Sequence, residues 1–477
     1  MTQGQSRKVA VLGAGITGLA AAYELCKRGR RGGPSWEVAV FEADTRVGGK
    51  IRTENNEGAV CETGPDSFIT AKPQALELVR ELGLESELLR TNQQHRAVFM
   101  LCGGRLVPMP EGISLVLPTR LWPFLRSGLL TWPGKLRMAM EPFVPRLSGE
   151  GDESLAAFFE RRLGPEAVAK LVAPLLGGIF AGDASKLSLN STFPQFAEME
   201  RRGGLLREFL RARRPRSAPA ADVTMFMTLK GGLCLLPETL ARRLPAGCLR
   251  LGAAVKEIVR RGSRWEVRSA RGREEFDAVV SALPAPALAG VVEGMDVEFA
   301  GVLREIPFAS SAVVTLAYER RDFSHPLEGF GMLVPRAEGR RLNAATFSST
   351  KFPGRVPPGL VVLRGFLGGA GRDADAEADE AQVARTARNE LRDILGLGQA
   401  HPRWTRAARW PRANPQYNVG HGLRLKRLES CLQAHPGLIL AGDSFRGVGL
   451  PDCIRSGGQA AQRLLSSAGG RQISGVA

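Results

Sequence analysis

The pattern of hydrophobic positions is most regular at the start of the chain. The apolar run Lys8 to Leu12 predicts a short buried strand, and the alanine-rich segment that ends near Cys26 predicts a helix. A second run, Glu37 to Phe41, predicts another buried strand. Glycines fill the turn between the first strand and the helix. This order of strand, turn, helix and strand predicts a βαβ unit with a parallel sheet.

The glycines of that turn have the spacing of a dinucleotide-binding fingerprint. Gly13 allows a tight turn, Gly15 lets the backbone approach a pyrophosphate, and Gly18 lets helix and strand pack closely. The start of the helix presents free N–H groups to phosphate. Glu42 ends the second strand and is placed to accept hydrogen bonds from ribose hydroxyls. A dinucleotide site is therefore predicted, and a plain structural turn is the alternative.

The middle of the chain is less regular and admits two interpretations. Residues 113–147 mix apolar side chains with Trp122, Trp132, several prolines and cations. Amphipathic helices that carry aromatic and cationic residues can lie in a membrane interface. The alternative is a helical domain whose aromatic residues form its core. Farther on, Asp152 to Gly164 predicts a capped helix, and Arg201 to Ala220 predicts a solvated connection.

Strand-like runs return in the second half and predict an α/β architecture. The predicted strands are Leu249 to Ile258, Phe276 to Leu283, Ala312 to Ala317, Leu360 to Phe366 and Leu438 to Ala441. A helix is expected from about Ala376 to Leu395, and Gly396 is expected to end it.

The composition narrows the class of protein. With 477 residues, 44% of them hydrophobic, the chain is too long and too apolar to be disordered or fibrous. About three domains of ~150 residues are expected. Lys and Arg number 65 against 48 Asp and Glu, and the net charge of +17 favours anionic partners. The sequence carries no nucleic-acid-binding signature, so nucleic acid is not expected among them.

Cysteines and apolar runs bear on the compartment. Seven cysteines without C-x-x-C spacing predict neither a zinc site nor a disulfide framework, so a reducing compartment is expected. We find no signal-peptide pattern and no uninterrupted apolar run of about 18 residues. A protein that is soluble or lies on a surface is therefore predicted. The basic and aromatic character of residues 113–147 suits anionic lipid, so a cytoplasmic protein that attaches peripherally to the cytoplasmic membrane, without spanning it, is expected.

Further glycine motifs indicate a cofactor larger than a nicotinamide dinucleotide. Arg46 to Lys50 contains two successive glycines flanked by cations, which lets the main chain pass close to a second phosphate or a flavin ring. Gly64 to Ser67 and Gly442–Asp443 supply further turns. Together with the first turn and Glu42, these motifs resemble the FAD-dependent amine oxidase superfamily, which includes monoamine oxidases and phytoene desaturases.

Within that superfamily the chain is similar to the protoporphyrinogen IX oxidase family from Lys8 to about Ala461. The stretches that carry this resemblance are Glu62 to Phe68, Gly178 to Asp183, Lys230 to Leu233, Gly329 to Val334 and Ala441 to Ile454. One departure is Lys50, where the superfamily usually has arginine. Lysine keeps the charge but loses the bidentate fork.

The resemblance implies the fold class, a mixture of α/β and α+β. It consists of a Rossmann-like FAD-binding domain of the monoamine oxidase and p-hydroxybenzoate hydroxylase type, a mixed-sheet substrate domain and a helical membrane-docking domain. The discontinuous FAD-binding domain is expected to take residues 1–85, 221–290 and 410–477. The substrate domain would take 86–112, 205–220 and 291–409, and the helical domain 113–204.

The resemblance also implies that the cofactor is FAD. Some monoamine oxidases tether their flavin through a cysteine, and this chain has none in the corresponding stretch, so noncovalent binding is predicted. Val255 is expected beside the adenine, and Trp410 and Val448 to Leu450 beside the isoalloxazine, although Val255 and Trp410 could equally be ordinary strand and core residues. The predicted cofactor-binding residues are Gly13, Ala14, Gly15, Ile16, Thr17, Gly18, Glu42, Ala43, Gly49, Lys50, Gly64, Pro65, Asp66, Ser67, Val255, Trp410, Gly442, Asp443, Val448, Gly449 and Leu450.

The reaction that the resemblance implies is the oxidation of protoporphyrinogen IX to protoporphyrin IX in haem biosynthesis. The substrate loses six electrons in three flavin turnovers, and O₂ accepts them and becomes H₂O₂. Arg96 would bind a propionate, because guanidinium matches carboxylate geometry, or it is a solvated surface residue. The predicted substrate-binding residues are Arg96, Gly178, Ile179, Phe330, Met332, Leu333 and Phe366, and the apolar ones have core packing as their alternative. No general base and no metal site is assigned.

Alternative functions stay open at this point. A sister oxidase acting on coproporphyrinogen III or on an amine is one, and a non-catalytic FAD-fold module that escorts lipidated proteins is another. The expected partners are the porphyrinogen, O₂ and a membrane surface. A homodimer is one option for the oligomeric state, which the sequence leaves open.

Overall fold

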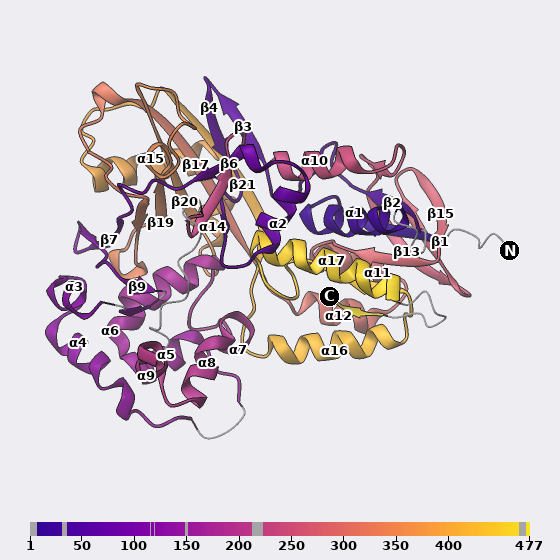
Figure 1. Cartoon of the computed structure of the whole chain (residues 1–477), viewed down its shortest axis with the longest axis horizontal. Helices are drawn as coiled ribbons and strands as arrows, with labels where there is room; N and C mark the ends of the chain where they lie inside the picture. Colours follow the sequence, from indigo (N-terminus) through magenta and orange to yellow (C-terminus); the bar gives the residue numbers. More distant parts are fainter. Residues whose placement is uncertain are drawn as a thin grey trace.

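The computed structural model of the chain describes residues 7–30, 36–114, 116–118, 120–147, 151–211, 223–466 and 474–477. The described part has three regions, shown in Figure 1. An α/β region contains both the first and the last strands, a second region is built on an antiparallel sheet, and a third consists of helices from the middle of the chain.

The α/β region is built on a six-stranded sheet whose strands come from the start, middle and end of the chain. In spatial order these are β12 (Leu249–Arg250), β2 (Trp36–Phe41), β1 (Arg7–Leu12), β16 (Ala278–Ser281), β22 (Leu438–Leu440) and β23 (Gly475–Val476). All five pairings are parallel. Helices cover both faces, which explains why these strands are apolar without alternation.

Each face of this sheet has its own hydrophobic core. On one face lie α1 (Ile16–Arg30), α2 (Gln74–Glu81), α10 (Leu235–Arg243) and α17 (Leu450–Ser466). On the other lie α11 (Ala285–Val292), α12 (Val297–Arg304) and α16 (His421–Gln433). Helices α1 and α17, from opposite ends of the chain, run side by side in Figure 1. The predicted βαβ unit is therefore present, and the C-terminal helix α17 packs beside its helix α1.

The second region is a seven-stranded sheet, antiparallel except where β18 meets β7. In spatial order its strands are β21 (Trp404–Pro415), β17 (Phe308–Glu319), β20 (Leu360–Gly368), β19 (Leu342–Phe347), β18 (Gly331–Leu333), β7 (Val98–Cys102) and β8 (Arg105–Pro108). Helix α15 (Glu380–Leu395) packs on one face. It ends at Gly396, which has a left-handed φ of 64°, as the sequence predicted.

The described residues also form four smaller sheets. They are the β3 (Thr53–Asn56) and β4 (Ala59–Glu62) pair, the β9 (Ile113–Ser114) and β10 (Leu117–Pro118) pair, the set of β5 (Phe68–Ile69), β11 (Phe226–Leu229) and β6 (Leu88–Arg90), and the set of β13 (Val255–Arg261), β14 (Arg264–Ser269) and β15 (Gly272–Phe276).

The helical region has its own core of aromatic and aliphatic side chains. Its helices are α3 (Leu121–Arg126), α4 (Trp132–Ala139), α5 (Leu155–Leu163), α6 (Pro165–Ala167), a π-helix over Val168–Gly177, α7 (Leu189–Thr192), α8 (Pro194–Arg201) and α9 (Leu205–Arg211). Helix α5 is the predicted capped helix, because the Ser154 side chain accepts from Ala157 N–H and Gly164 ends it. Phe124 is buried here, whereas Trp122 and Trp132 are exposed.

Three predicted boundaries differ from the structure. The strand expected over Leu249 to Ile258 is broken by a turn at Gly252, which has a φ of 61° that favours glycine. The helix expected from Ala376 is divided into α14 (Asp373–Glu377) and α15, because Asp379 caps a new helix. The connection expected over Arg201 to Ala220 is helical as far as Arg211, since Leu205 is buried in the core, and residues 212–222 lie outside the described residues.

Candidate cofactor and substrate site

The first glycine turn has the shape that a pyrophosphate requires. A Cβ atom on Gly18 would lie 1.9 Å from the Gly13 carbonyl oxygen, so only glycine lets α1 pack this closely. A Cβ atom on Gly15 would meet no protein atom within 4 Å. The turn is therefore packed on its inner side and open at Gly15, which fits the close approach of a phosphate to the N-terminus of α1.

Glu42 lies beside this turn, as predicted. Its carboxylate accepts the Ala14 N–H at 2.7 Å and the Asp44 N–H at 2.9 Å. Its backbone oxygen accepts the Ala253 N–H at 2.7 Å, which ties it to the connection that leads into β13. The half-buried Val255 starts β13 two residues later, so the structure brings Val255 near Glu42. A carboxylate has more acceptor positions than these two N–H groups fill, and the remainder suit ribose hydroxyls.

The double-glycine motif joins the first turn to the end of the chain. The Gly48 N–H donates to Ala14 O at 2.8 Å, and a Cβ atom on Gly49 would lie 3.4 Å from the Gly15 Cα. Lys50 Nζ lies 2.5 Å from Asp443 Oδ2 and donates also to the Ala413 carbonyl. Lys50 and Asp443, two predicted cofactor-binding residues from opposite ends of the chain, are thus in contact.

The turn Gly64 to Ser67 is anchored to the seven-stranded sheet. Trp410 Nε1 donates to Thr63 O at 2.7 Å, and Arg364 Nη2 donates to Gly64 O at 2.7 Å. Asp66 pairs with Lys351 at 2.9 Å and with Arg364 at 3.1 Å. Although burial opposes ionisation, Lys351 and Arg364 hold the pKa of Asp66 well below its usual range.

The segment before α17 is held by two stacked rings. The Tyr417 and His421 rings stack with centroids 4.2 Å apart. Tyr417 donates to Asp443 O at 2.5 Å, and His421 Nε2 lies 2.9 Å from Phe445 O. Burial lowers the pKa of His421 to about 4, so the imidazole is neutral at neutral pH.

Lys351, Arg364, Tyr417 and His421 were not predicted as site residues. The sequence held one signal for Arg364, a charged residue inside the otherwise apolar run Leu360 to Phe366. A charge in the middle of a buried strand requires a partner, and here the partner is Asp66.

The predicted substrate residues divide between the two faces of the seven-stranded sheet. Leu333 pairs with Ala344, and Ala344 pairs with Phe366, so these three share one face. Arg364 lies two residues before Phe366 and therefore on that same face, with its guanidinium 5.1 Å from the Phe366 ring centroid. Met332 points the other way and is buried in the core beneath α15. Met332 is therefore not on the face where the other predicted residues lie.

The remaining predicted substrate residues lie outside the strands, in segments next to the seven-stranded sheet. Phe330 is half-buried and bonded through its backbone to Ala97 and Phe347. Ile179 is 54% exposed in the short helical turn between the π-helix and the following loop, and Gly178 precedes it. That loop contacts the end of β20, because Ala370 N–H donates to Ala181 O at 2.8 Å. Arg96 is exposed, and among the described residues its side chain has no recorded partner.

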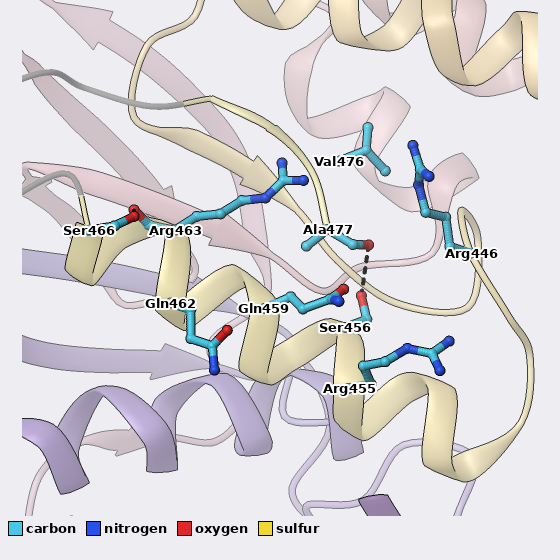
Figure 2. A pocket seen from close by; sticks show the side chains of 9 residues that line it. All are labelled: Arg446, Arg455, Ser456, Gln459, Gln462, Arg463, Ser466, Val476 and Ala477. Atoms are coloured by element: carbon cyan, nitrogen blue, oxygen red, sulfur yellow. Dashed lines mark hydrogen bonds between the residues drawn. The ribbon is translucent and has the colours of Figure 1, made fainter. Parts of the chain in front are cut away.

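A separate hollow of about 640 Å³ lies between α17 and the C-terminal residues Val476 and Ala477 (Figure 2). Its lining is largely polar and includes Arg446, Arg455, Gln459 and Arg463. Ser456 connects it to the predicted site, since its hydroxyl accepts the Gly442 N–H at 2.9 Å and donates to Ala477 O at 3.0 Å. None of the predicted site residues lines this hollow. Within the described ranges no cluster of three His, Cys, Asp or Glu side chains is arranged to hold a metal.

The fold and the glycine turns together are those of a dinucleotide-binding protein. Comparison with known sequences gives the particular family: the chain belongs to the flavin-containing amine oxidoreductases, whose family model matches residues 16–465. This membership confirms the resemblance predicted from the motifs and the prediction of FAD as the cofactor. The protein is a flavin oxidoreductase.

Relatives and solved structures agree with this family. A coproporphyrinogen III oxidase of Bacillus subtilis is 34% identical over 466 residues, covering 96% of this chain and 98% of the relative. The protoporphyrinogen oxidase of Homo sapiens is also 34% identical, covering 97% and 99%. A crystal structure from Exiguobacterium sp. 255-15, provisionally assigned as a protoporphyrinogen oxidase, has a TM-score of 0.86 at 31% identity and covers 97% of this chain and 99% of that one.

Proposed function

We propose that the protein oxidises a porphyrinogen to the corresponding porphyrin in haem biosynthesis, with O₂ as the electron acceptor and H₂O₂ as its product. The observation that carries this proposal is the similarity over nearly the whole chain to porphyrinogen oxidases of bacteria and mammals. Glycine turns that suit a dinucleotide, and an apolar sheet face with Leu333 and Phe366 in a separate region of the chain, support it.

The chain's own residues would bind FAD and the substrate, orient the two and exclude water from between them. Bound FAD supplies the redox chemistry of this family. The turns at Gly13 to Gly18, Arg46 to Lys50 and Gly442–Asp443 would hold it noncovalently. The backbone N–H groups of Val448 to Leu450 lie at the N-terminus of α17. Because a helix N-terminus carries partial positive charge, they would give that end of the site a positive potential. Phe366 and Leu333 offer an apolar wall against which a macrocycle could lie.

The substrate itself has two candidates. Protoporphyrinogen IX is the substrate that the motifs predict, and mammalian relatives carry that name. Coproporphyrinogen III is favoured by the names of three bacterial relatives. The similarity to the Bacillus subtilis protein covers 98% of that relative's length. An aerobic assay with each porphyrinogen, followed by red porphyrin fluorescence, distinguishes them. A flavin-loaded protein that oxidises neither one contradicts the proposal.

Arg96 is proposed to bind a propionate of the substrate. We expect Arg96→Ala to raise the KM for the porphyrinogen about tenfold while FAD stays bound, because one charge-assisted hydrogen bond is lost outside the cofactor site. Steady-state kinetics and the flavin absorbance of the purified variant check this. Unchanged kinetics would remove Arg96 from the site.

We further propose that the helical region docks on an anionic membrane surface. Four large apolar side chains of α3 and α4 are between 62% and 68% exposed: Leu121, Trp122, Trp132 and Leu136. The exposed Arg126 lies 4.7 Å from the Trp122 ring centroid, and the two helices flank a hollow of about 550 Å³. Lys135 lies 4.7 Å from the Trp132 ring centroid but is buried, and its ammonium donates to the Leu125 and Ser127 carbonyls. Aromatic rings beside cations suit the lipid headgroup level. No helix within the described residues is long and apolar enough to span a bilayer.

Flotation with liposomes that contain anionic lipid tests this docking. We expect wild-type protein to float at low salt and to be released at high salt, because part of the attraction is electrostatic. Trp122→Ala with Trp132→Ala should abolish flotation. Val297→Ala, which alters an apolar side chain 72% exposed on α12, is the matched control. Flotation of the double variant equal to that of wild type would refute the docking surface.

A further inference from the structure

A buried arginine and a half-buried lysine share a single carboxylate beside the predicted flavin turn. Lys351, at the end of α13 (Ser348–Lys351), lies 2.9 Å and 3.1 Å from the two Asp66 oxygens. Arg364 of β20 lies 3.1 Å from Asp66 Oδ2. The three side chains are only 14%, 3% and 16% exposed, in the order Lys351, Arg364 and Asp66. The cluster therefore carries one unit of excess positive charge away from bulk water.

The cluster also has hydrogen-bond donors left over. An ammonium group has three N–H donors, and within the described residues the recorded acceptors of Lys351 Nζ are the two oxygens of Asp66. Arg364 Nε is buried and has no hydrogen-bond partner in the part of the chain that the structure describes. Buried cations with unused donors are unfavourable unless an acceptor, best an anion, completes them.

The cluster lies between the two halves of the proposed site. On one side, Arg364 and Trp410 both bond to the backbone at Thr63 and Gly64, next to the predicted flavin-binding residues. On the other side, Arg364 shares a sheet face with Phe366, and Phe366 is in register with Leu333 through Ala344. The backbone of Lys351 accepts the Asn92 N–H at 3.0 Å, which ties it to the loop that carries Arg96.

We propose that Lys351, supported by Arg364, is a specificity-determining residue that binds a carboxylate side chain of the substrate. The inference rests on the proposed function, since it assumes a flat apolar substrate with carboxylate arms. Asp66 holds the two cations in place and neutralises one of them. One substrate carboxylate would neutralise the other and bring the cluster to zero net charge.

Porphyrin binding to the FAD-loaded protein tests this without relying on turnover. The probes are coproporphyrin III, a tetracarboxylate, and its tetramethyl ester, which has the same ring but no negative charge. Fluorescence titration gives the Kd for each. We expect Lys351→Met to weaken binding of the free acid about tenfold and to leave binding of the ester within about twofold, because one charge-assisted hydrogen bond is lost.

Further variants separate charge from packing. Lys351→Arg should keep most of the preference for the free acid, since it keeps the cation. Asp66→Asn should tighten binding of the free acid, because it removes the anion that competes with the ligand. Lys426→Met, which alters an exposed lysine on α16, is the matched control and should change neither Kd.

The outcomes are distinguishable from those of the proposed function. Equal weakening of acid and ester binding in Lys351→Met, or no change in either, overturns the inference. Failure of Asp66→Asn to tighten binding of the free acid also counts against it. A wild-type protein that binds the free acid through Lys351 but forms no porphyrin from either porphyrinogen contradicts the proposed function and leaves the inference standing.

Discussion

At the scale of single residues, two glycines of the first turn predict opposite consequences of the same added methyl group. On Gly18 it would collide with the Gly13 carbonyl, whereas on Gly15 it would meet no protein atom within 4 Å. Gly18→Ala should therefore lower the free energy of unfolding by about 1–3 kcal/mol, as overpacking does. Gly15→Ala should leave it unchanged and weaken FAD binding, because the methyl group occupies the space for the pyrophosphate.

Thermal unfolding of the flavin-free variants and titration with FAD check both halves of this prediction. Gly15→Ala serves as the folding control for Gly18→Ala. If Gly15→Ala bound FAD as tightly as wild type, the turn would not be part of the cofactor site.

His421 predicts a pH dependence of stability. Burial lowers its pKa from 6.5 to about 4 in the folded chain. Between these values the unfolded chain binds a proton that the folded chain does not, so stability is lost as pH falls from 6.5 towards 4. The contribution reaches about 3 kcal/mol at the low end.

Chemical unfolding of His421→Gln across this pH range measures that contribution. The variant should lose less stability than wild type on acidification, and the exposed His401→Gln should behave as wild type does. Parallel pH curves for wild type and His421→Gln would contradict the prediction.

Local and long-range residue roles differ in how far the sequence predicts them. The roles of Gly13, Gly15 and Gly18 follow from their spacing, because a strand, a turn and a helix fix their surroundings. The partnership of Asp66 with Lys351 does not, since the two are 285 positions apart and meet only through the folding of the second sheet.

At the scale of elements, a buried ion pair holds the helical region together. Glu141 and Arg162 are 0% and 2% exposed and are bonded to each other. Glu141 also accepts the N–H groups of Leu205 and Leu206, at 2.8 Å and 3.0 Å, at the start of α9. We expect Glu141→Ala to destabilise this region by about 3–5 kcal/mol, because the buried Arg162 guanidinium is left with a longer carboxylate contact, to Glu200 at 3.4 Å, and two backbone N–H groups lose their acceptor.

Hydrogen exchange of the helical region measures that effect locally. Protection of α5 and α9 should fall in Glu141→Ala. Glu198→Ala removes an exposed partner of Arg201 and Arg202 and should change protection by less than about 1 kcal/mol. Equal protection in Glu141→Ala and wild type would show that the pair does not stabilise the helices.

Element boundaries followed the sequence where one residue determines the backbone. Gly396 ends α15 as predicted because a left-handed residue there suits glycine. Met332 and Leu333 were both predicted to bind substrate, and their opposite orientations could have been expected from the sequence alone. Neighbouring residues of a strand point to opposite faces, so both cannot line the same surface.

At the scale of the whole molecule, the sequence predicted that both ends of the chain build one cofactor region. Each end supplies an apolar strand followed by a glycine turn and a helix, and such units complete their sheet by pairing in parallel. The six-stranded sheet and the contact of α1 with α17 agree. The proposed docking surface of the helical region was not contained in this pattern, because it depends on which tryptophans stay exposed after folding.

Anaerobic mixing of the purified FAD-loaded protein with protoporphyrinogen IX or coproporphyrinogen III tests the central claim most directly. The account predicts that one of them bleaches the visible flavin absorbance. Admission of O₂ should then restore that absorbance and leave H₂O₂, with red porphyrin fluorescence after further turnovers. A flavin spectrum that stays unchanged with both porphyrinogens would contradict the account.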